Sequence, residues 1–327
     1  MELLVRAHQI TSLGGPDGLR WAEVPEPANG DGAVLIDVAA AGVSFADLLQ
    51  TRGAYQMQVE LPYTPGMDAA GVVRSAAPGT GFTPGQRVAV LVPYGCWQEV
   101  ISAPAARVLP LPAQVSLEAG AAAPLNDLTA MFALVRRARA QAGETLLVHG
   151  AAGGVGSASI QLGRALGLRT VAVVSDEAKR EFALACGAHH AVLSQGWLVA
   201  VRELLGERPV DIVLDPVGGD RMTDSLRSLS PEGRLLVVGF AEGDIPVVKV
   251  NRLLLGNTGV LGAACREFFE QRPEAVAELW EQATGLRRSA GLEDLPVQAF
   301  PFADAHGALH AIASRRALGK VVLSRQL

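Results

Sequence analysis

The chain has 327 residues, a length that suggests two domains, and 49% of them are hydrophobic, which is sufficient for a buried core. The net charge of −5, without any run of like charges, argues against a nucleic-acid partner. The sequence shows no stretch of about 18 uncharged apolar residues and no signal peptide at its N-terminus, so we expect a cytoplasmic protein that does not span a membrane. The three cysteines form no motif and are interpreted as buried or idle thiols.

The first part of the chain, to about residue 110, predicts a β-rich domain. Short runs of Val, Leu and Ile are separated by Pro and Gly turns. We expect strands over 33–38, 71–74, 87–92 and 98–101. Ser116 is a candidate helix N-cap, and two helices are predicted after it, over 119–123 and 127–139, the second ended by Gly143.

From residue 145 onward the pattern alternates between apolar strands and helices. We expect strands over 145–149, 170–174, 191–193, 212–214 and 235–238, with helices over 157–166 and 177–186. A further helix over 266–288 and a last strand over 320–324 follow. Strands that alternate with helices of about ten residues indicate βαβ units and a parallel sheet, so the sequence predicts an α/β fold.

A glycine-rich turn, Gly150-Ala151-Ala152-Gly153-Gly154-Val155-Gly156, joins the first of these strands to its helix. Glycines at the second and third positions of such a turn allow a pyrophosphate to approach the backbone and the helix to pack closely on the strand. The first N–H groups of the helix then face the pyrophosphate. The turn therefore predicts a dinucleotide site, with expected contacts at Ala152, Gly153, Gly154, Val155 and Gly156.

The end of the next strand decides between NADPH and NADH. An acidic residue there, about 20 residues after the turn, would bind the ribose 2′-hydroxyl and repel a 2′-phosphate. That position holds Ser175, with Lys179 and Arg180 shortly after it, and a hydroxyl with nearby cations suits a phosphate. Asp176 is the alternative ribose ligand if the strand ends one residue later. We expect Ser175 and Lys179 to bind NADPH, with NADH as the less favoured cofactor.

The glycine turn and several further motifs resemble the medium-chain dehydrogenase/reductase superfamily, and within it the zinc-free quinone oxidoreductases of the zeta-crystallin type. These motifs follow in family order over nearly the whole chain: Gly42-Val43-Ser44-Phe45-Ala46-Asp47, Pro65-Gly66-Met67-Asp68, Pro84-Gly85-Gln86-Arg87-Val88, Asp215-Pro216-Val217-Gly218-Gly219 and Gly319-Lys320-Val321-Val322-Leu323. The resemblance implies a GroES-like β-rich catalytic domain (1–124, completed by 268–327) and a Rossmann domain with a doubly wound parallel sheet (125–267).

The zinc-dependent branch of this superfamily places a Cys in the first of these motifs and a His-Glu pair after the glycine of the second. Here those places hold Ser44, Met67 and Asp68. Zinc takes about four ligands from Cys, His and carboxylate side chains, so a single carboxylate is not sufficient. We expect an enzyme without a metal.

Without a metal to polarise a carbonyl, hydride transfer is easiest to an acceptor that is already electron-poor. The resemblance therefore implies an NADPH-dependent oxidoreductase that acts on a quinone or another conjugated carbonyl compound. The candidate catalytic side chains are Ser44, Tyr55, Tyr63 and Thr129, and packed aromatic rings are the alternative interpretation of the tyrosines. Asp47 is interpreted as a structural hydrogen-bond acceptor.

The resemblance also places Asn126 and Thr129 beside the nicotinamide, although capping of a helix is an alternative role for Asn126. The expected cofactor contacts are completed by Val217, Gly239, Phe240 and Lys320. Two other functions stay open: an enoyl-thioester reductase of the same superfamily, and an NADPH-binding redox sensor or crystallin-like protein without turnover.

The histidines give no sign of a metal site. His149, at a strand end, is interpreted as a core residue. His306 and His310 are four residues apart, but the sequence shows no third ligand beside them.

The segment over 253–264 is almost continuously apolar or small. The resemblance places it at the edge of the Rossmann sheet, where an exposed edge tends to pair with another chain. We expect a homodimer joined partly through this edge, with a fully buried strand as the alternative.

Overall fold

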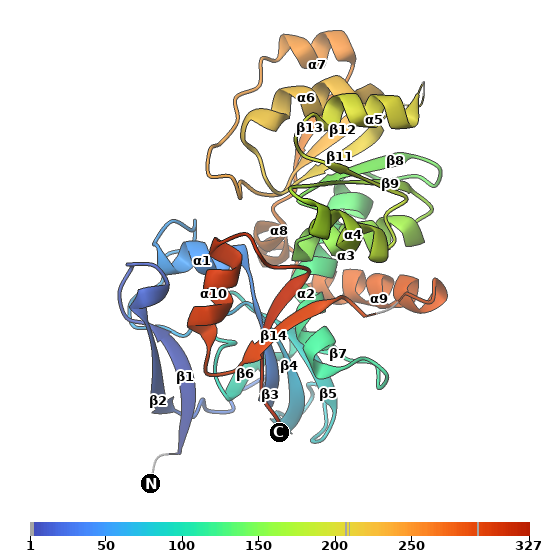
Figure 1. The fold of residues 1–327 in the computed structure, drawn as a ribbon. Coiled ribbons are helices and arrows are strands. Elements are labelled where there is room, and N and C mark those ends of the chain that lie inside the picture. The colour runs from blue at the N-terminus through green and yellow to red at the C-terminus, as the bar shows by residue number, and fades with distance from the viewer. Residues whose placement is uncertain (1–2, 207, 209, 293) are drawn as a thin grey trace. The chain divides into compact units, whose positions relative to one another are not determined.

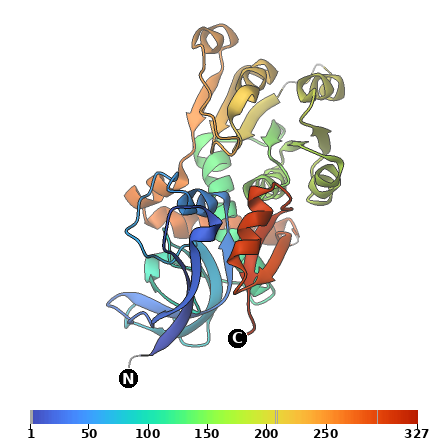
Figure 2. The same cartoon turned by 60° about the vertical axis from the view of Figure 1, so that its left-hand side comes forward.

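The structure is a computed structural model that describes residues 3–206, 208, 210–292 and 294–327, and the chain forms two compact units (Figures 1 and 2). Unit 1 comprises Met1–Leu125, Arg272–Trp280 and Asp294–Leu327, and unit 2 comprises Asn126–Gln271 and Glu281–Glu293. The predicted limits put 268–327 as a whole in the first domain, whereas residues 268–271 and 281–293 cluster with unit 2. Each unit has its own sheet and its own hydrophobic core.

Unit 1 is built on a mainly antiparallel sheet with strand order β14-β15-β3-β4-β5-β7, and β6 also pairs with β3. Strands β14 and β15 run parallel to each other, and the other neighbours are antiparallel. The strands are β3 (Ala33–Val43), β4 (Asp68–Ala76), β5 (Arg87–Leu91), β6 (Val100–Pro104), β7 (Val108–Pro110), β14 (Val297–Pro301) and β15 (Lys320–Ser324). A separate hairpin pairs β1 (Leu4–Ile10) with β2 (Leu19–Pro25).

Trp97 lies at the centre of the unit 1 core. Its ring is fully buried, and its Nε1 donates a hydrogen bond to the carbonyl oxygen of Gly42 at 2.8 Å. Gly66 has a φ of 97°, and a Cβ added there would lie 2.2 Å from Cδ1 of Trp97. Both the left-handed backbone and the lack of space require glycine at this turn. Because the turn packs closely on Trp97, the start of β4, including Asp68, lies against the core.

Helices α1 (Phe45–Thr51) and α10 (Ala305–Ala313) lie side by side in unit 1 (Figures 1 and 2). Side chains cap both helices, Ser44 at α1 and Asp304 at α10. A short 3₁₀ turn in the β1–β2 connection, η1 (Pro16–Gly18), also contacts α10. A second 3₁₀ turn, η2 (Ala105–Arg107), precedes β7. The N-terminal loop and the C-terminal helix therefore meet within one unit.

Unit 2 is a doubly wound parallel sheet with strand order β10-β9-β8-β11-β12-β13. Its strands are β8 (Thr145–His149), β9 (Arg169–Val174), β10 (His190–Leu193), β11 (Val210–Asp215), β12 (Leu229–Val237) and β13 (Gly259–Gly262). Taken in chain order this is the arrangement of a Rossmann fold, in which the direction of winding reverses between β8 and β11. The predicted fold class is confirmed.

Helices cover both faces of this sheet, with α3 and α4 on one face and α5 and α6 on the other (Figure 1). Their bounds are α3 (Gly154–Ala165), α4 (Glu177–Ala185), α5 (Trp197–Leu205) and α6 (Met222–Ser228), the last preceded by the 3₁₀ turn η4 (Gly219–Arg221). The sequence did not predict α5 and α6, which are short and begin without a side-chain cap. Among the described residues, no helix has the length and apolar character needed to cross a membrane.

Two predicted helix boundaries were wrong. The segments 119–123 and 127–139 belong to one helix, α2 (Leu117–Met131), which contains Pro124 and continues as a π-helix (Phe132–Arg137). Proline removes only one backbone hydrogen bond, and buried Ala and Leu side chains on both sides keep α2 continuous. The predicted helix over 266–288 is divided near Pro273 into α8 (Cys265–Gln271) and α9 (Glu274–Ser289), because the residue before a proline disfavours helical geometry.

The apolar segment over 253–264 contains both a helix end and an edge strand. Helix α7 (Asn251–Gly256) is followed by Asn257 in the left-handed conformation, with a φ of 49°, which ends the helix. Strand β13 then forms one edge of the sheet beside β12. Leu254 and Leu255 are 76% and 79% exposed. The segment is therefore partly at the sheet edge, as predicted, but its first residues are helical and face solvent.

Candidate functional site

The glycine-rich turn after β8 has the geometry of a dinucleotide site. It leaves β8 through Gly150, with a φ of 58°, and enters α3 with Gly153 as the N-cap. A Cβ added to Gly156 would lie 2.3 Å from the carbonyl oxygen of Gly150, so the protein's own backbone requires glycine there. A Cβ added to Gly153 would meet nothing closer than that same oxygen at 3.4 Å, an ordinary contact. The space beside Gly153 is therefore open to a ligand, as a pyrophosphate needs.

The start of α3 is suited to bind an anion. Gly153 is exposed, Ala152 is buried beneath the turn, and Val155 is half-buried. The N-cap, Gly153, offers no side chain to cap the helix, and the first N–H groups of α3 form the positive end of the helix dipole. This is the arrangement that the sequence predicts for these residues.

Asn126 and Thr129 lie three positions apart on α2 and so share a face of that helix. Asn126 is buried, and a Cβ added to Gly154 would lie 2.8 Å from both its Nδ2 and its Oδ1. Asn126 therefore packs against the glycine turn, and it lies inside α2 and not at the start of that helix. Thr129 is also buried, and its Oγ1 lies 3.2 Å from Sγ of Cys265.

Ser175, Asp176 and Lys179 form a hydrogen-bonded cluster at the end of β9. The Nζ of Lys179 donates to Oγ of Ser175 at 2.8 Å and lies 3.2 Å from Oδ2 of Asp176. Asp176 caps α4 by accepting from the backbone N of Lys179 at 3.0 Å, and this bond lowers the pKa of Asp176. The carboxylate is thus engaged in capping, and the hydroxyl of Ser175 and the ammonium of Lys179 lie together at the end of β9.

The loops after β11 and β12 lie at the same edge of the sheet, beyond the carboxyl ends of the strands. Asp215 ends β11, and its Oδ1 accepts from the backbone N of Val217 at 2.8 Å and of Gly218 at 3.0 Å. Burial raises the pKa of Asp215. Gly239 and the partly exposed Phe240 follow β12. Asp215 was not among the predicted site residues, because its role in holding the Val217 loop appears only in the structure.

In unit 1, Ser44 and Asp47 form a reciprocal cap at the start of α1. The backbone N and the Oγ of Ser44 donate to Oδ2 of Asp47 at 2.7 and 2.6 Å, and the backbone N of Asp47 donates to Oγ of Ser44 at 3.3 Å. Asp47 is fully buried, and burial raises its pKa to about 6. Its Oδ1 has no hydrogen-bond partner among the described residues. Asp47 is therefore the acceptor that fixes Ser44.

Asp68 and Lys320 form a buried ion pair. The Nζ of Lys320 lies 2.9 Å from Oδ2 and 3.1 Å from Oδ1 of Asp68. Gly42 lies directly against the pair, since a Cβ added there would be 2.0 Å from Oδ1 of Asp68. Burial raises the pKa of Asp68, and the ammonium of Lys320 opposes that shift. Lys320 was assigned to the cofactor from its motif alone, and no local pattern indicated this ion pair.

The two candidate tyrosines of unit 1 differ in their surroundings. Tyr63 is buried, its hydroxyl donates to Oε1 of Gln50 at 3.4 Å, and its ring packs edge-on against Tyr94. Burial raises the pKa of Tyr63 to about 12, with a smaller contribution from the charge of Asp47. Tyr63 therefore keeps its proton at neutral pH and acts as a hydrogen-bond donor. Tyr55 is half-buried in the connection between α1 and β4.

Ser44, Asp47, Tyr63, Asp68 and Lys320 are coupled electrostatically and are called here the unit 1 polar cluster. The charges of Asp68 and Lys320 act on the pKa of Asp47, and the charge of Asp47 acts on Tyr63. Of the four predicted catalytic residues, Ser44 and Tyr63 belong to this cluster and Thr129 belongs to unit 2.

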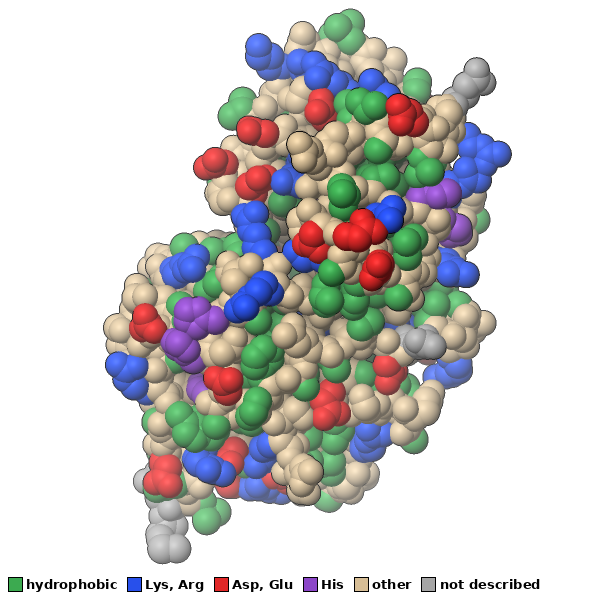
Figure 3. Space-filling view, in the orientation of Figure 1, with side chains coloured by type: hydrophobic (Ala, Val, Ile, Leu, Met, Phe, Trp, Pro, Cys, Tyr) green, Lys and Arg blue, Asp and Glu red, His purple; other side chains and the backbone are tan. Residues whose placement is uncertain are grey.

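The histidines occupy two kinds of position. His149 is fully buried, its Nε2 lies 2.9 Å from Oγ of Ser225, and burial lowers its pKa to about 3, so it is a neutral core residue. His306 and His310 are exposed on α10, and histidine side chains are purple in Figure 3. The sequence indicated no third ligand beside them, and this was wrong, because Asp17 of η1 lies within reach of both.

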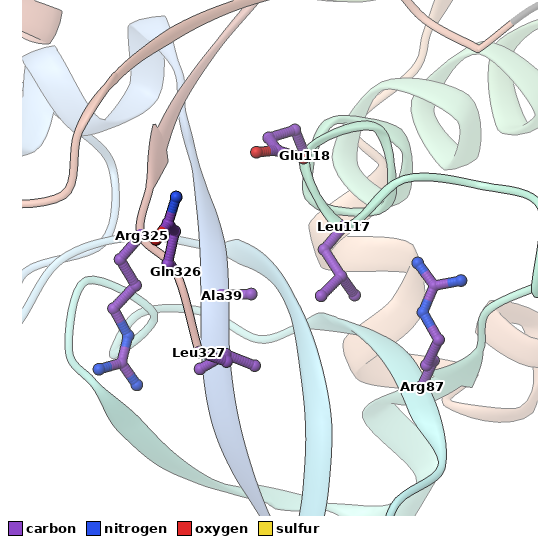
Figure 4. A pocket seen from close by; sticks show the side chains of 7 residues that line it. All are labelled: Ala39, Arg87, Leu117, Glu118, Arg325, Gln326 and Leu327. Carbon is purple, nitrogen blue, oxygen red and sulfur yellow. The ribbon is translucent and has the colours of Figure 1, made fainter.

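A surface hollow of about 480 Å³ in unit 1 contains none of the predicted site residues (Figure 4). Its lining residues are Ala39, Arg87, Leu117, Glu118, Arg325, Gln326 and Leu327. The guanidinium of Arg87 donates to the carbonyl oxygens of Ala113 and Val115, and that of Arg325 donates to those of Val38 and Glu99. Both cations are engaged by the protein itself, so we assign no site there.

Comparison with known proteins places these features in a family. The alcohol dehydrogenase GroES-like domain matches residues 30–113, and the family described as zinc-binding dehydrogenase matches residues 154–282. Quinone oxidoreductase-like protein 2 of Rattus norvegicus is 35% identical over 323 residues, which are 98% of this chain and 92% of that protein. The 2-haloacrylate reductase of a Burkholderia species is 31% identical over 333 residues, 99% of this chain and 100% of that protein.

A solved structure agrees with these matches. The quinone oxidoreductase of Thermus thermophilus, described together with its NADPH complex, has a TM-score of 0.81 and 36% identity, and the match covers 98% of this chain and 100% of that one. A GroES-like domain joined to a Rossmann domain defines an oxidoreductase of the medium-chain dehydrogenase/reductase class. Within that class the chain belongs to the quinone oxidoreductase family, which confirms the predicted family.

Proposed function

We propose that the protein transfers hydride from NADPH to a quinone or another conjugated carbonyl compound without the help of a metal ion. The observation that carries this proposal is the turn after β8, where the protein leaves Gly153 without a side chain although its own packing does not require that. Space for a ligand explains this glycine, and a pyrophosphate on the N-terminus of α3 is the ligand that the surrounding Rossmann sheet predicts.

NADPH, when bound, supplies the hydride. The residues that would hold it in unit 2 are Asn126, Thr129, Ala152, Gly153, Gly154, Val155, Gly156, Ser175, Lys179, Val217, Gly239 and Phe240. The preference for NADPH rests on Ser175 and Lys179, whose hydroxyl and ammonium lie 2.8 Å apart at the end of β9. Asp176 disfavours NADPH less than its charge suggests, because its carboxylate already accepts from the backbone N of Lys179 and the hydroxyl of Ser175.

On the acceptor side, we propose that Ser44 orients a carbonyl oxygen of the substrate and that Tyr63 and Tyr55 of unit 1 contribute hydrogen bonds. The catalytic role of Thr129 in unit 2 stays a prediction. Asp47 positions the Ser44 hydroxyl. Two buried polar atoms of unit 1, Oδ1 of Asp47 and Nε2 of Gln50, lack partners among the described residues. Unsatisfied buried groups are costly, so a polar ligand atom in their vicinity would be stabilised.

The unit 1 polar cluster supports an enzyme without catalytic zinc. The carboxylate that could serve as a ligand, Asp68, already holds the ammonium of Lys320 at 2.9 Å. Met67 and Ser44, which occupy the other motif positions, are not zinc ligands of the usual kind. A second cation at Asp68 would have to displace Lys320 from a buried position, which is costly. The donor set therefore does not fit a catalytic zinc, although the family matched by residues 154–282 carries zinc in its description.

The direct test is steady-state oxidation of NADPH in the presence of 9,10-phenanthrenequinone. We expect turnover with this quinone, higher kcat/KM with NADPH than with NADH, and no turnover without an acceptor. NADPH binding without turnover on either a quinone or an enone would contradict the proposal and favour a redox sensor.

A second candidate is reduction of a carbon–carbon double bond conjugated to a carboxyl group or thioester. The relative named 2-haloacrylate reductase matches nearly the whole chain and favours it. Activity on crotonyl-CoA or 2-chloroacrylate, with none on quinones, would select this candidate. The same glycine turn and the same NADPH would serve both reactions.

We also propose that the protein is cytoplasmic and forms a homodimer through β13. The exposed apolar side chains that precede this edge strand are Ile245, Val247, Val250, Leu254 and Leu255. Burial of such a surface by a second copy would be favourable. Light scattering at micromolar concentration should give twice the monomer mass of 34.1 kDa, and the monomer mass would exclude the dimer.

A further inference from the structure

Three potential metal ligands meet at the surface of unit 1, far from one another in sequence. Nε2 of His306 lies 2.9 Å from Oδ1 of Asp17, and the ring centroids of His306 and His310 are 4.4 Å apart. One ligand atom from each of the three residues lies within 4.8 Å of the others. Within the described part of the chain, this is the one group of three or more His, Cys, Asp or Glu side chains that meets that distance.

The local structure holds these residues in place. His306 and His310 are four positions apart on α10, so both rings project from one face of the helix. The loop that carries Asp17 is anchored by backbone hydrogen bonds, from Gly15 to Thr51 and from Gly18 to Gly15. The guanidinium of Arg20 donates to the carbonyl oxygen of Asp17 at 2.8 Å, which fixes the backbone at that residue. The cluster therefore rests on ordered elements of unit 1.

The geometry is close to that of a bound transition metal. Ligand atoms about 2.0–2.1 Å from a tetrahedral zinc are separated from one another by about 3.4 Å. The side chains of His306 and Asp17 are 52% and 88% exposed, so small rotations can exchange their mutual contact for contacts with an ion and close the remaining separations. Solvent access also leaves room for water in a fourth position. The positive charge of Arg20 near Asp17 opposes a cation but already engages backbone oxygens.

We propose that Asp17, His306 and His310 bind one divalent transition-metal ion. Zinc and nickel are the ions that suit this ligand set. Two imidazole nitrogens and one carboxylate oxygen select such ions over magnesium and calcium, which prefer oxygen ligands. The bound ion fastens η1 to α10 and so joins residues 289 positions apart in the chain. Because it binds only the folded arrangement, it stabilises unit 1 in proportion to its concentration. This site is independent of the proposed NADPH-dependent reaction.

The test is calorimetric titration of the metal-stripped full-length protein with zinc chloride, with magnesium chloride as the second titrant. We expect one zinc ion per chain, no magnesium binding, and a melting temperature that rises with zinc concentration. His310→Gln and, separately, Asp17→Asn should lower zinc affinity by about tenfold or more. The matched control is His190→Gln on β10, whose side chain is outside the cluster and whose removal should leave zinc binding unchanged.

Three results would overturn the proposal: no zinc binding by the natural protein, unchanged zinc affinity in His310→Gln, or an equal loss in the control. If His310→Gln does not fold, His306→Gln tests the same ligand set. Cobalt absorption spectra distinguish a site with nitrogen ligands from nonspecific binding to exposed carboxylates. Loss of the cobalt signal in both histidine variants is the expected outcome, and its persistence would contradict the site.

Discussion

The two units carry predicted site residues of different kinds. In unit 2 the site is made of backbone, with glycines, N–H groups and strand ends arranged around a turn. In unit 1 the predicted residues are buried or half-buried side chains, with two carboxylates, an ammonium and two hydroxyl groups in the unit 1 polar cluster. A backbone site tolerates most side-chain changes but no added Cβ, whereas a buried charged cluster depends on each of its partners. Mutations of the predicted site residues should therefore affect ligand binding and stability differently in the two units.

The largest effect is expected from breaking the ion pair of unit 1. Lys320→Met leaves Asp68 buried without its cation, and such changes cost about 3–5 kcal/mol. Replacing both partners, with Lys320→Met and Asp68→Leu together, should recover most of that loss, because an apolar pair needs no desolvated charge. Urea denaturation of the single and double variants measures both values. Full stability of the Lys320→Met variant would show that the pair is not formed.

Two glycines of the turn, Gly153 and Gly156, allow ligand binding and stability to be tested separately in unit 2. Gly156→Ala places a Cβ 2.3 Å from the carbonyl oxygen of Gly150 and should destabilise the protein by about 3 kcal/mol. Gly153→Ala meets only an ordinary contact at 3.4 Å and should leave the melting temperature nearly unchanged, but should weaken NADPH binding by at least about tenfold. Calorimetry and fluorescence titration of NADPH separate the two effects. Normal NADPH affinity in a folded Gly153→Ala variant would show that the pyrophosphate does not bind at this turn.

Asp47 makes the stability of unit 1 depend on pH in an unusual direction. Its pKa in the folded protein is about 6, above the ordinary value of 3.8, so folding favours the protonated form. The resulting stabilisation is fully present below about pH 4 and is lost as the pH rises through about 6, a change of about 3 kcal/mol. Asp47→Asn should remove this dependence. The free energy of unfolding of both proteins between pH 4 and pH 7.5 tests it, with the exposed Asp220→Asn as control.

The smallest of these effects concerns the choice of cofactor. Lys179→Ala should reduce kcat/KM for NADPH by roughly 10- to 150-fold, because a hydrogen bond to a charged group contributes about 1.5–3 kcal/mol. The value for NADH should change little. Arg180→Ala is the matched control, since that guanidinium is paired with Glu177 at the surface. Equal losses for both cofactors, or equal use of both by the natural protein, would make Asp176 the ribose ligand.

The contrast between the units also explains what the sequence could predict. Gly153, Ser175 and the strand ends of unit 2 follow a local pattern of strand, turn and helix, so both the sheet and the position of the turn were predictable. The pairing of Asp68 with Lys320 joins residues 252 positions apart, and no local spacing indicates it.

The cluster on α10 also depends on a contact between distant parts of the chain. His306 and His310 have a recognisable helical spacing, but their third partner, Asp17, is supplied by the far end of the chain. Asn126 was assigned from its motif, but neither its place inside α2 nor its contact with Gly154 followed from the local pattern. Local signals therefore located the glycine turn of unit 2, and the side-chain cluster of unit 1 required the three-dimensional structure.

The most direct test of the proposed metal-free reaction is quinone reduction with NADPH before and after removal of all metal by a chelator. Zinc content is measured in parallel. The experiment should use both the natural protein and His310→Gln, each compared with its own untreated sample, so that metal held on α10 is distinguished from metal near Asp68. We predict that turnover of each protein is unchanged by the chelator, because Lys320 supplies the cation beside Asp68. Loss of turnover together with stoichiometric zinc, and its return when zinc is restored, would contradict the account.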